Sequence, residues 1–478
     1  MHITFGTDGW RAIIAEDFTF ENLKLVTGAI ATYIKNSEDP GEGVVVGYDQ
    51  RFLSEQFAEA VAEILGGNGL KVYLTSKPTP TPVTAFAIKH WKCKGGIMLT
   101  ASHNPATYHG IKYIPYFAGP ALPETTKKIE EALHQIAQNK EEIKGIKFSE
   151  LENQGLVEKI DPQEPYLNHL KEIIDISAIK DNPAKIIIDP MYGAGIGYIE
   201  KFLEDSGCEV AAIHNYRDPL FGGGMPEPKE DQLGELKTKV LQEKAKLGLA
   251  LDGDADRFGV IDKNGEYITP NQILSLVLDH LITGRGWEGP VARTVSTTHT
   301  LDNICEIYGT FVKETPVGFK YIGQALREGC ILGGEESGGL SIKGHIPEKD
   351  GILACLLILE ILCASEKSIS ENLQDLKEKY GGFVSRRLDL KVEPEQKEEL
   401  QEIVKAYEPV KILGKPVVER ITVDGTKIKL ADGSWVLIRP SGTEPLFRIY
   451  AEAPTMDEVE AMQMEVKGEV FGRKGSIK

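Results

Sequence analysis

The chain has 478 residues, of which 41% are hydrophobic and 26% charged, a composition typical of a folded globular protein rather than a disordered or membrane-embedded one. Its 54 lysine and arginine residues against 72 aspartate and glutamate residues leave a formal net charge of −18. This acidic balance argues against a nucleic-acid partner and against an anionic membrane surface, because both require a cationic face. An anionic substrate would need positive charge concentrated in one pocket.

We expect a cytoplasmic protein of three or four domains. The N-terminal segment has no basic stretch followed by an apolar one, so no signal peptide is expected. The longest apolar stretch, Gly351 to Ala364, is interrupted by Glu360 and is shorter than the roughly 20 residues of a membrane span, so it predicts a buried helix. The cysteines form no C-x-x-C pair, which favours buried, reduced thiols.

A strand–helix–strand–strand pattern recurs three times along the chain and indicates α/β layers around a largely parallel sheet. Ligands bind outside the carboxyl ends of the strands in such sheets, and each copy ends in an unusual loop at that place. After about Tyr380 the pattern changes to an α+β module. The expected elements are strands at 44–49, 70–74, 96–99, 185–189, 208–213, 247–251, 291–295, 310–312, 330–332, 383–392 and 446–451, helices at 54–65, 197–206, 301–308, 394–407 and from 456, and a hairpin at 421–438.

The acidic loop that ends the second copy places Asp252, Asp254 and Asp256 at alternate positions after a strand. Three carboxylates that converge on one ion suit Mg²⁺, which keeps positions open for phosphate oxygens. The alternative is a solvated acidic turn. An EF-hand is excluded, because Arg257 replaces its glycine and Lys263 its bidentate glutamate.

The other loops carry hydroxyl, acidic and cationic groups. Ser102 follows a strand beside His103. A serine takes part in group transfer if a base or a metal activates it, or if it carries a phosphoryl group supplied beforehand. The alternative is a structural turn. No G-x-S-x-G motif surrounds it, which excludes an α/β-hydrolase. Glu335 and Ser337 suit sugar hydroxyls or form a helix-capping turn. The last loop predicts either a site that holds a dianion such as phosphate or a structural turn that only displays polar side chains. Its residues are Arg439, Ser441, Gly442, Thr443 and, in the strand that follows, Arg448.

These four loops, together with the segment Phe5–Arg11, resemble the α-D-phosphohexomutase superfamily over the whole chain. Members of this superfamily move a phosphoryl group between the 1- and 6-positions of hexoses. The resemblance implies an α/β fold of three similar domains, with mixed sheets between helices, and a smaller α+β C-terminal domain around a central cleft. The expected domain bounds are 1–150 for the domain with the phosphoserine loop, 151–258 for the domain with the metal loop, 259–378 for the domain with the sugar loop and 379–478 for the domain with the phosphate loop.

The resemblance also implies a role for each site residue. Ser102 would carry the phosphoryl group and complete a Mg²⁺ site with Asp252, Asp254 and Asp256. The serine would be assisted by His103, Lys112, Arg257 and Arg11, of which Lys112 matches a family lysine proposed to help proton transfer. The substrate would be held by Lys320, Glu335, Ser337, Arg439, Ser441, Gly442, Thr443 and Arg448, with His299 as a further substrate-facing residue.

The activity implied is that of a phosphoglucomutase, which interconverts glucose 1-phosphate and glucose 6-phosphate reversibly through a phosphoserine and glucose 1,6-bisphosphate. The bisphosphate would also prime the serine, and the chain would be a monomer or homodimer. Glu336 and Thr100 favour glucose over glucosamine. A phosphomannomutase, a dual-specificity enzyme and, more remotely, a non-catalytic sugar-phosphate sensor are the alternatives. Gly339 stands where several relatives have a histidine, for which His345 or Lys349 could compensate.

Overall fold

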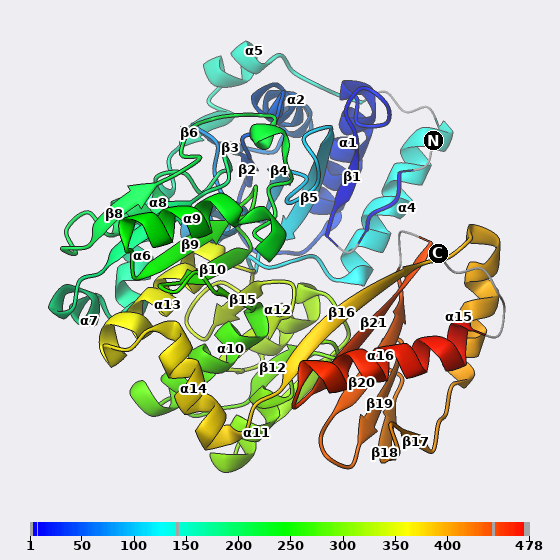
Figure 1. Cartoon of the computed structure of the whole chain (residues 1–478). Coiled ribbons are helices and arrows are strands. Elements are labelled where there is room, and N and C mark those ends of the chain that lie inside the picture. Colours follow the sequence, from blue (N-terminus) through cyan, green and yellow to red (C-terminus); the bar gives the residue numbers. More distant parts are fainter. Residues whose placement is uncertain (1–2, 7, 140–142, 442–444, 473–478) are drawn as a thin grey trace.

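The computed structural model describes residues 3–6, 8–139, 143–441 and 445–472, and it contains four β-sheets in chain order (Figure 1). In each of the first three, at least three parallel strands are extended by an antiparallel strand. The fourth sheet is antiparallel throughout. The α/β fold expected from the sequence is therefore confirmed.

The first sheet has the strand order β1-β5-β4-β2-β3-β6. Side chains alternate across a strand, so Val44 and Val46 of β2 pack with α1, α2 and α4, whereas Val45 packs with α3 on the opposite face. The edge strand β6 lies beyond residue 150, where we expected the domain to end. The elements are β1 (Trp10–Ile13), α1 (Phe20–Asn36), β2 (Val44–Tyr48), α2 (Ser54–Gly67), β3 (Val72–Thr75), α3 (Thr81–His90), β4 (Gly95–Leu99), β5 (Tyr108–Pro115), α4 (Pro123–Asn139), α5 (Phe148–Asn153) and β6 (Val157–Ile160).

The second sheet has the order β11-β10-β9-β7-β8. Ile187 of β7 packs with α9, and its neighbours Ile186 and Ile188 face the opposite side with α8. Helix α8 is shorter than expected and begins after Gly197, which has a φ of +78°. The elements are α6 (Gln163–Ile173), α7 (Ile176–Asp181), β7 (Lys185–Asp189), α8 (Tyr198–Phe202), β8 (Glu209–Ala212), η1 (Phe221–Gly223), η2 (Glu230–Gln232), α9 (Gly234–Glu243), β9 (Leu247–Leu251), β10 (Phe258–Asp262) and β11 (Tyr267–Ile268).

The third sheet has the order β13-β12-β14-β15, and β13 and β14 begin two residues later than predicted. Helix α13 is the buried helix expected at 351–364; it packs on β9 and β10 of the second sheet and on β15 of the third. No helix in the described part of the chain combines the length and apolarity needed to cross a membrane. The elements are α10 (Pro270–Asp279), η3 (His280–Gly284), β12 (Val291–Thr294), α11 (Thr300–Ile307), β13 (Val312–Thr315), α12 (Phe319–Arg327), β14 (Leu332–Glu335), β15 (Gly339–Ile342), α13 (Gly351–Ser365) and α14 (Ile369–Tyr380).

The fourth sheet has the order β16-β21-β20-β19-β18-β17, and Figure 1 shows α16 lying across it. Alternation along β20 gives the sheet two apolar faces. Val436 and Ile438 pack with α16, whereas Trp435 and Leu437 pack against Val295 of the third domain. The elements are β16 (Val384–Lys391), η4 (Pro394–Gln396), α15 (Lys397–Ala406), β17 (Lys411–Ile412), β18 (Lys415–Ile421), β19 (Thr426–Leu430), β20 (Trp435–Pro440), β21 (Leu446–Ala453) and α16 (Met456–Phe471).

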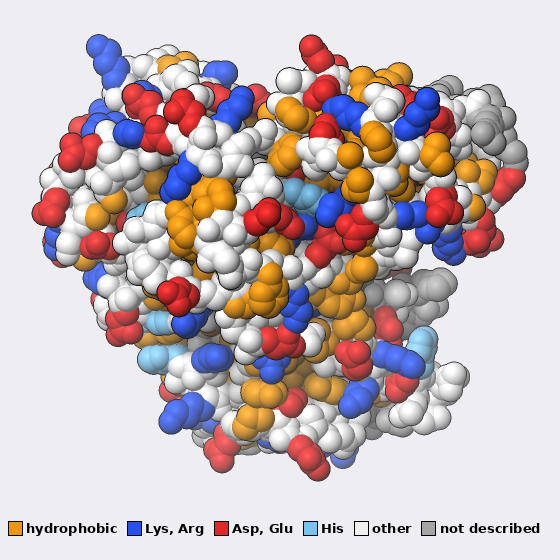
Figure 2. Space-filling view, turned by 90° about the horizontal axis from the view of Figure 1, so that it is seen from below, with side chains coloured by type: hydrophobic (Ala, Val, Ile, Leu, Met, Phe, Trp, Pro, Cys, Tyr) orange, Lys and Arg blue, Asp and Glu red, His pale blue; other side chains and the backbone are white. Residues whose placement is uncertain are grey.

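The three chemistry-bearing loops occupy the same position in the three similar domains. Each follows the carboxyl end of the third strand of its core and leads into the antiparallel strand, so the loops join β4 to β5, β9 to β10 and β14 to β15. The returning strands β5, β10 and β15 were not predicted. On the face shown in Figure 2, cationic and acidic side chains are interspersed.

Candidate active site

Ser102 is buried in the β4–β5 loop and faces the acidic loop of the second domain. Its hydroxyl donates to Oδ2 of Asp252 at 3.0 Å and lies 3.2 Å from Nδ1 of His103. Its backbone is left-handed, with a φ of +50°, and its N–H donates to Oγ1 of Thr100 at 2.8 Å. A left-handed serine costs roughly 1 kcal/mol or more, so surrounding contacts must hold the loop in this shape.

Arg51 holds the serine loop from beneath, and the sequence analysis missed it. Its Nη2 donates to the carbonyls of Ser102 and Asn104, both at 2.6 Å, and its Nη1 to those of Pro105 and Tyr108 at 2.8 and 3.0 Å. The guanidinium has no solvent exposure and pairs with the equally buried Asp49 at 3.2 Å. An acidic and a basic residue two positions apart, directly after a buried strand, were the available signal.

The three aspartates of the β9–β10 loop are buried, and one carboxylate oxygen of each lies within 4.8 Å of the others. Oδ1 of Asp254 and Oδ1 of Asp256 are buried without a hydrogen-bond partner. Buried oxygens without partners are costly in a folded protein unless a cation or water satisfies them. Carboxylate oxygens are the ligands that Mg²⁺ prefers, so these residues fit the divalent cation expected from the sequence.

Electrostatics make the cluster unfavourable without added positive charge. Burial first, and then the carboxylates of Asp254 and Asp256, raise the pKa of Asp252 well above its usual value. Burial would raise the pKa of Asp254 too, but Lys112 and the hydroxyl of Thr81 hold it below its usual value. Thr81 donates to Oδ2 of Asp254 at 2.6 Å. A divalent cation at the cluster would relieve the remaining repulsion.

Two buried lysines contact the acidic cluster. Lys112, from β5, places Nζ 2.8 Å from Oδ2 of Asp8, 3.0 Å from Oδ2 of Asp254 and 3.4 Å from Oδ2 of Asp256. Burial alone would lower the pKa of Lys112, but these carboxylates outweigh it and raise the pKa, so the amine is a cation. Lys349 lies 3.2 Å from the same oxygen of Asp256.

Gly339 lets Lys349 reach the cluster. A Cβ at position 339 would lie 2.6 Å from Cδ and 2.7 Å from Cγ of Lys349, closer than the packed atoms can approach. His345, the other candidate substitute, is turned away: its Nε2 bonds Asp350 at 2.8 Å and its Nδ1 bonds His169 at 3.0 Å. Lys349 is therefore the side chain that occupies this part of the site.

The remaining residues expected around the serine line its immediate surroundings. The N–H of Arg257 donates to Oδ1 of Asp252 at 3.0 Å, and its Nη1 donates to Glu227 at 3.2 Å. Arg11 donates to the side chain of Asn104 in the serine loop at 2.8 Å. Burial first, then the charges of Arg257 and Arg11, lower the pKa of His103 well below its usual value, so its imidazole is neutral.

A cavity of about 230 Å³ lies beside Arg257, between the metal loop, the sugar loop and the C-terminal domain. Ser337 and Glu336 of the sugar loop line it, while Glu335 lies beneath them and accepts from Ser337 at 2.7 Å. Thr294 and Thr297 fix Glu336 by donating to its Oε2 at 3.1 and 3.4 Å. On the opposite wall the lining includes Arg386, Arg387 and Tyr450.

The expected phosphate cradle lies at the β20–β21 turn, and Gly442 and Thr443 fall outside the described residues. Arg439 and Arg448 are paired neighbours across these strands, and Nε of Arg439 donates to Oδ2 of Asp424 at 2.8 Å. Ser441 is buried, with its N–H donated to the carbonyl of Leu446 at 2.9 Å.

Two further residues expected to face the substrate lie elsewhere. Lys320 is half-buried in the first turn of α12, where burial lowers its pKa and Asp8 partly opposes that effect. His299 is buried at the contact with the C-terminal domain, and its Nε2 lies 2.9 Å from Nζ of Lys427. Neither Lys320 nor His299 belongs to the described residues that line the cavity.

Comparison with known proteins accounts for nearly the whole chain. Models of phosphoglucomutase/phosphomannomutase α/β/α domains I, II and III match residues 2–140, 164–265 and 269–380, and the model of the C-terminal domain matches residues 389–469. The chain belongs to the phosphoglucomutase/phosphomannomutase family. It is thus a phosphohexomutase, an isomerase that transfers a phosphoryl group within its substrate.

Relatives of this phosphohexomutase carry several names. A phosphoglucomutase/phosphomannomutase of Thermococcus kodakarensis is 33% identical, with 97% of each chain covered. A phosphoglucomutase of Komagataeibacter xylinus is 28% identical over 97% of this chain and 90% of that protein. A crystal structure from Thermus thermophilus that carries the name of a phosphomannomutase is 33% identical, with a TM-score of 0.83 over 98% of this chain and 99% of that one. These relatives share the family but are named for different hexose phosphates.

Proposed function

We propose that this phosphohexomutase is a Mg²⁺-dependent phosphoglucomutase that interconverts glucose 1-phosphate and glucose 6-phosphate through a phosphoserine at Ser102. The observation that supports this most directly is the 3.0 Å contact between the Ser102 hydroxyl and Asp252, beside two buried carboxylate oxygens without partners. A hydroxyl at that place is close enough for a phosphoryl group on it to share a cation with the aspartates.

When Mg²⁺ is bound by Asp252, Asp254 and Asp256, it would neutralise negative charge on the transferring phosphoryl group. The side chains of this chain do the positioning. Lys112 and Lys349 bring two positive charges to the same cluster. The neutral imidazole of His103 lies 3.2 Å from the Ser102 hydroxyl and can position the side chain that carries the phosphoryl group.

Each phosphoryl transfer balances without an external reagent. The bond from phosphorus to the Ser102 oxygen breaks as a bond to the free sugar hydroxyl forms, and the proton of that hydroxyl ends on the serine oxygen. The product, glucose 1,6-bisphosphate, turns about and returns its other phosphoryl group to Ser102, while the proton returns to the sugar. The same bisphosphate would prime an unphosphorylated serine.

The acceptors at the cavity support a sugar substrate, and the choice of glucose rests on the resemblance of Glu336 and Thr100 to glucose-specific family members. Glu336 presents a carboxylate to the cavity and is held there by Thr294 and Thr297. Neutral sugar hydroxyls can donate to such a group. A phosphomannomutase or dual-specificity activity is the second candidate, favoured by the Thermococcus kodakarensis relative's name. Measuring kcat/KM for the 1-phosphates of glucose, mannose, glucosamine and N-acetylglucosamine separates them; a clear preference for any sugar but glucose would overturn the first assignment.

The nucleophile is tested with Ser102→Ala. We expect this variant to keep its fold and lose turnover, and we expect intact-mass analysis of the wild-type protein after incubation with glucose 1,6-bisphosphate to show an increment of about 80 Da on Ser102. A sugar-phosphate sensor would bind the hexose phosphate without acquiring that mass. Near-normal isomerisation by Ser102→Ala would exclude Ser102 as the nucleophile.

A further inference from the structure

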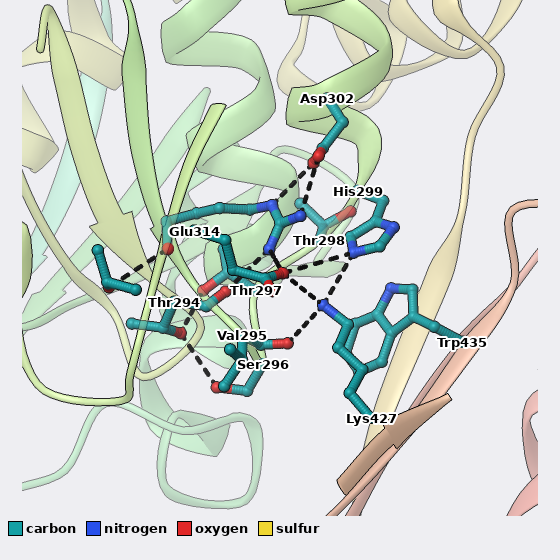
Figure 3. A network of polar contacts seen from close by, with 12 residues as sticks. Thr294, Val295, Ser296, Thr297, Thr298, His299, Asp302, Glu314, Lys427 and Trp435 are labelled. Atoms are coloured by element: carbon teal, nitrogen blue, oxygen red, sulfur yellow. Dashed lines mark hydrogen bonds and ion pairs between the residues drawn. The ribbon is translucent and has the colours of Figure 1, made fainter. Parts of the chain in front are cut away.

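Lys427, on β19 of the C-terminal domain, is buried in a polar pocket of the third domain (Figure 3). Its Nζ donates to the carbonyl of Val295 at 2.7 Å, to Nε2 of His299 at 2.9 Å and to Oε2 of Glu314 at 2.9 Å. A lysine ammonium has three N–H donors, and these three acceptors, all from the third domain, use every one. The ring of Trp435 packs over the ammonium at 4.4 Å.

The buried charge of Lys427 does not favour folding. Burial first, and then the nearby Arg293, lower the pKa of Lys427 to about 8, although Glu314 opposes the shift. Folding the protonated lysine into this pocket is therefore unfavourable. Glu314 would keep a cationic partner without Lys427, because Nη1 of Arg293 lies 2.5 Å from its Oε2. A neutral side chain at position 427 would leave no buried carboxylate unpaired.

The contacts of Lys427 connect it to the sugar loop, which joins β14 to β15. Val295 belongs to the segment 294–299, which runs from the last residue of β12 to the start of α11. Two threonines of that segment, Thr294 and Thr297, hold Glu336 at the cavity. Figure 3 shows Lys427 and these residues grouped around the same segment. The hydrogen bond from Lys427 to Val295 thus joins the C-terminal domain to the segment whose threonines hold Glu336.

The other side of Lys427 leads to the phosphate cradle. Strand β19 pairs with β20, which carries Arg439, and Thr426 is the register partner of Ile438. Three residues before Lys427, Asp424 accepts from Nε of Arg439 at 2.8 Å and from the N–H of Val317, in the third domain, at 3.1 Å. The segment 424–427 therefore contacts the third domain at both of its ends and the cradle at one.

We propose that Lys427 is a positioning residue that fixes the phosphate cradle, through Arg439, relative to the sugar loop, through Glu336. This inference rests on the mutase function proposed above. A hexose phosphate that is held at both places, and in either of two orientations, needs a constant distance between them. A displacement of about 1 Å between positioning groups can reduce activity by roughly 100-fold. A buried ionic contact serves such a registry better than an apolar one, because only one arrangement satisfies its donors.

The test compares Lys427→Met with Lys429→Met in the full-length protein. Lys429 lies two residues further along β19 and pairs with Glu419 at the surface, at 3.1 Å, so it is the matched control. We expect Lys427→Met to retain its thermal midpoint, to acquire the phosphoryl group on Ser102 normally, and to raise KM for glucose 1-phosphate at least tenfold. Hydrogen exchange of the amides of residues 294–299 should quicken in Lys427→Met alone.

A KM and an exchange rate in Lys427→Met equal to those of the control would overturn the inference. So would faster exchange throughout the C-terminal domain with a lowered thermal midpoint, because that result assigns Lys427 a purely structural role. Lys427→Gln, which keeps a donor for the Val295 carbonyl, should fall between wild type and Lys427→Met, and it carries the test if the methionine variant fails to fold. Should the wild type turn over no hexose phosphate, the proposed function fails, while the exchange measurements still decide the coupling.

Discussion

Lys349 reaches the acidic cluster past Gly339, and replacing either residue should impair the site. Lys349→Met takes away the ammonium that lies 3.2 Å from Oδ2 of Asp256. Gly339→Ala keeps Lys349 in the sequence but inserts a methyl group 2.6 Å from the lysine Cδ. Since carbon atoms pack at about 3.5–4.0 Å, the lysine must move away by roughly 1 Å, and its ammonium with it.

The expected magnitude follows from the partners that remain. Removing one positioned electrostatic group from an active site lowers kcat by about 100- to 1,000-fold. Lys112, 3.4 Å from the same Asp256 oxygen, retains part of the neutralisation. We therefore take the lower limit, a decrease of roughly 100-fold in kcat/KM for Lys349→Met. Gly339→Ala displaces the charge without deleting it, and we expect a decrease of about tenfold.

The assay is the initial rate of glucose 6-phosphate formation from glucose 1-phosphate, with saturating Mg²⁺ and glucose 1,6-bisphosphate. Gly234→Ala is the matched control, because Gly234 begins α9 and a Cβ there meets no atom within 4 Å. The reasoning is refuted if Lys349→Met retains kcat/KM within about threefold of the wild type. Loss of activity in Gly339→Ala alone would equally contradict it, because the glycine would then matter for a reason other than the lysine.

Two further predictions concern the metal cluster and a half-buried histidine. Asp256→Asn should weaken Mg²⁺ binding by more than about tenfold in calorimetric titration, and a chelator should abolish turnover until Mg²⁺ is restored; full activity after chelation would contradict the proposed metal site. Burial first, and then His345, lower the pKa of His169 to about 4, so its unfolded form binds more protons and stability falls as pH drops from about 6.5 to 4. The resulting loss, at most roughly 3 kcal/mol, should be smaller in His169→Gln when thermal midpoints are compared across that range.

The sequence predicted the elements whose signals are local. Val44–Tyr48, Lys185–Asp189 and Val291–Thr294 are short apolar runs between turn residues, and each is the first strand of a repeated core. Helix α13 was predicted correctly because a helix that is apolar on all sides must be buried. The loops of Ser102 and Asp252 were placed at strand ends because polar residues follow buried strands directly, and the two loops meet in the structure.

Features that depend on tertiary contacts were missed. The strand Tyr108–Pro115 mixes polar and apolar residues, yet all of it except Tyr108 is buried, because it lies between two other strands and supplies Lys112 to the acidic cluster. Arg51 bonds carbonyls more than 50 positions away, and no periodic pattern marks such a contact. The partner of His299, Lys427, lies 128 residues away on another domain. Pairings of this kind are set by domain packing.

The charges of the site divide between two places that the substrate must connect. Lys112 and Lys349 lie with the aspartates, where they compensate carboxylates and cannot select a phosphate by themselves. Among the described residues, the carboxylate of Asp424 accepts from Nε of Arg439, and a guanidinium is suited to bind a dianion. In the proposed mechanism, one end is neutralised for phosphoryl transfer and the other is cationic for binding. Reversible isomerisation requires each phosphate to visit both ends, so the spacing between them matters as much as the chemistry at either.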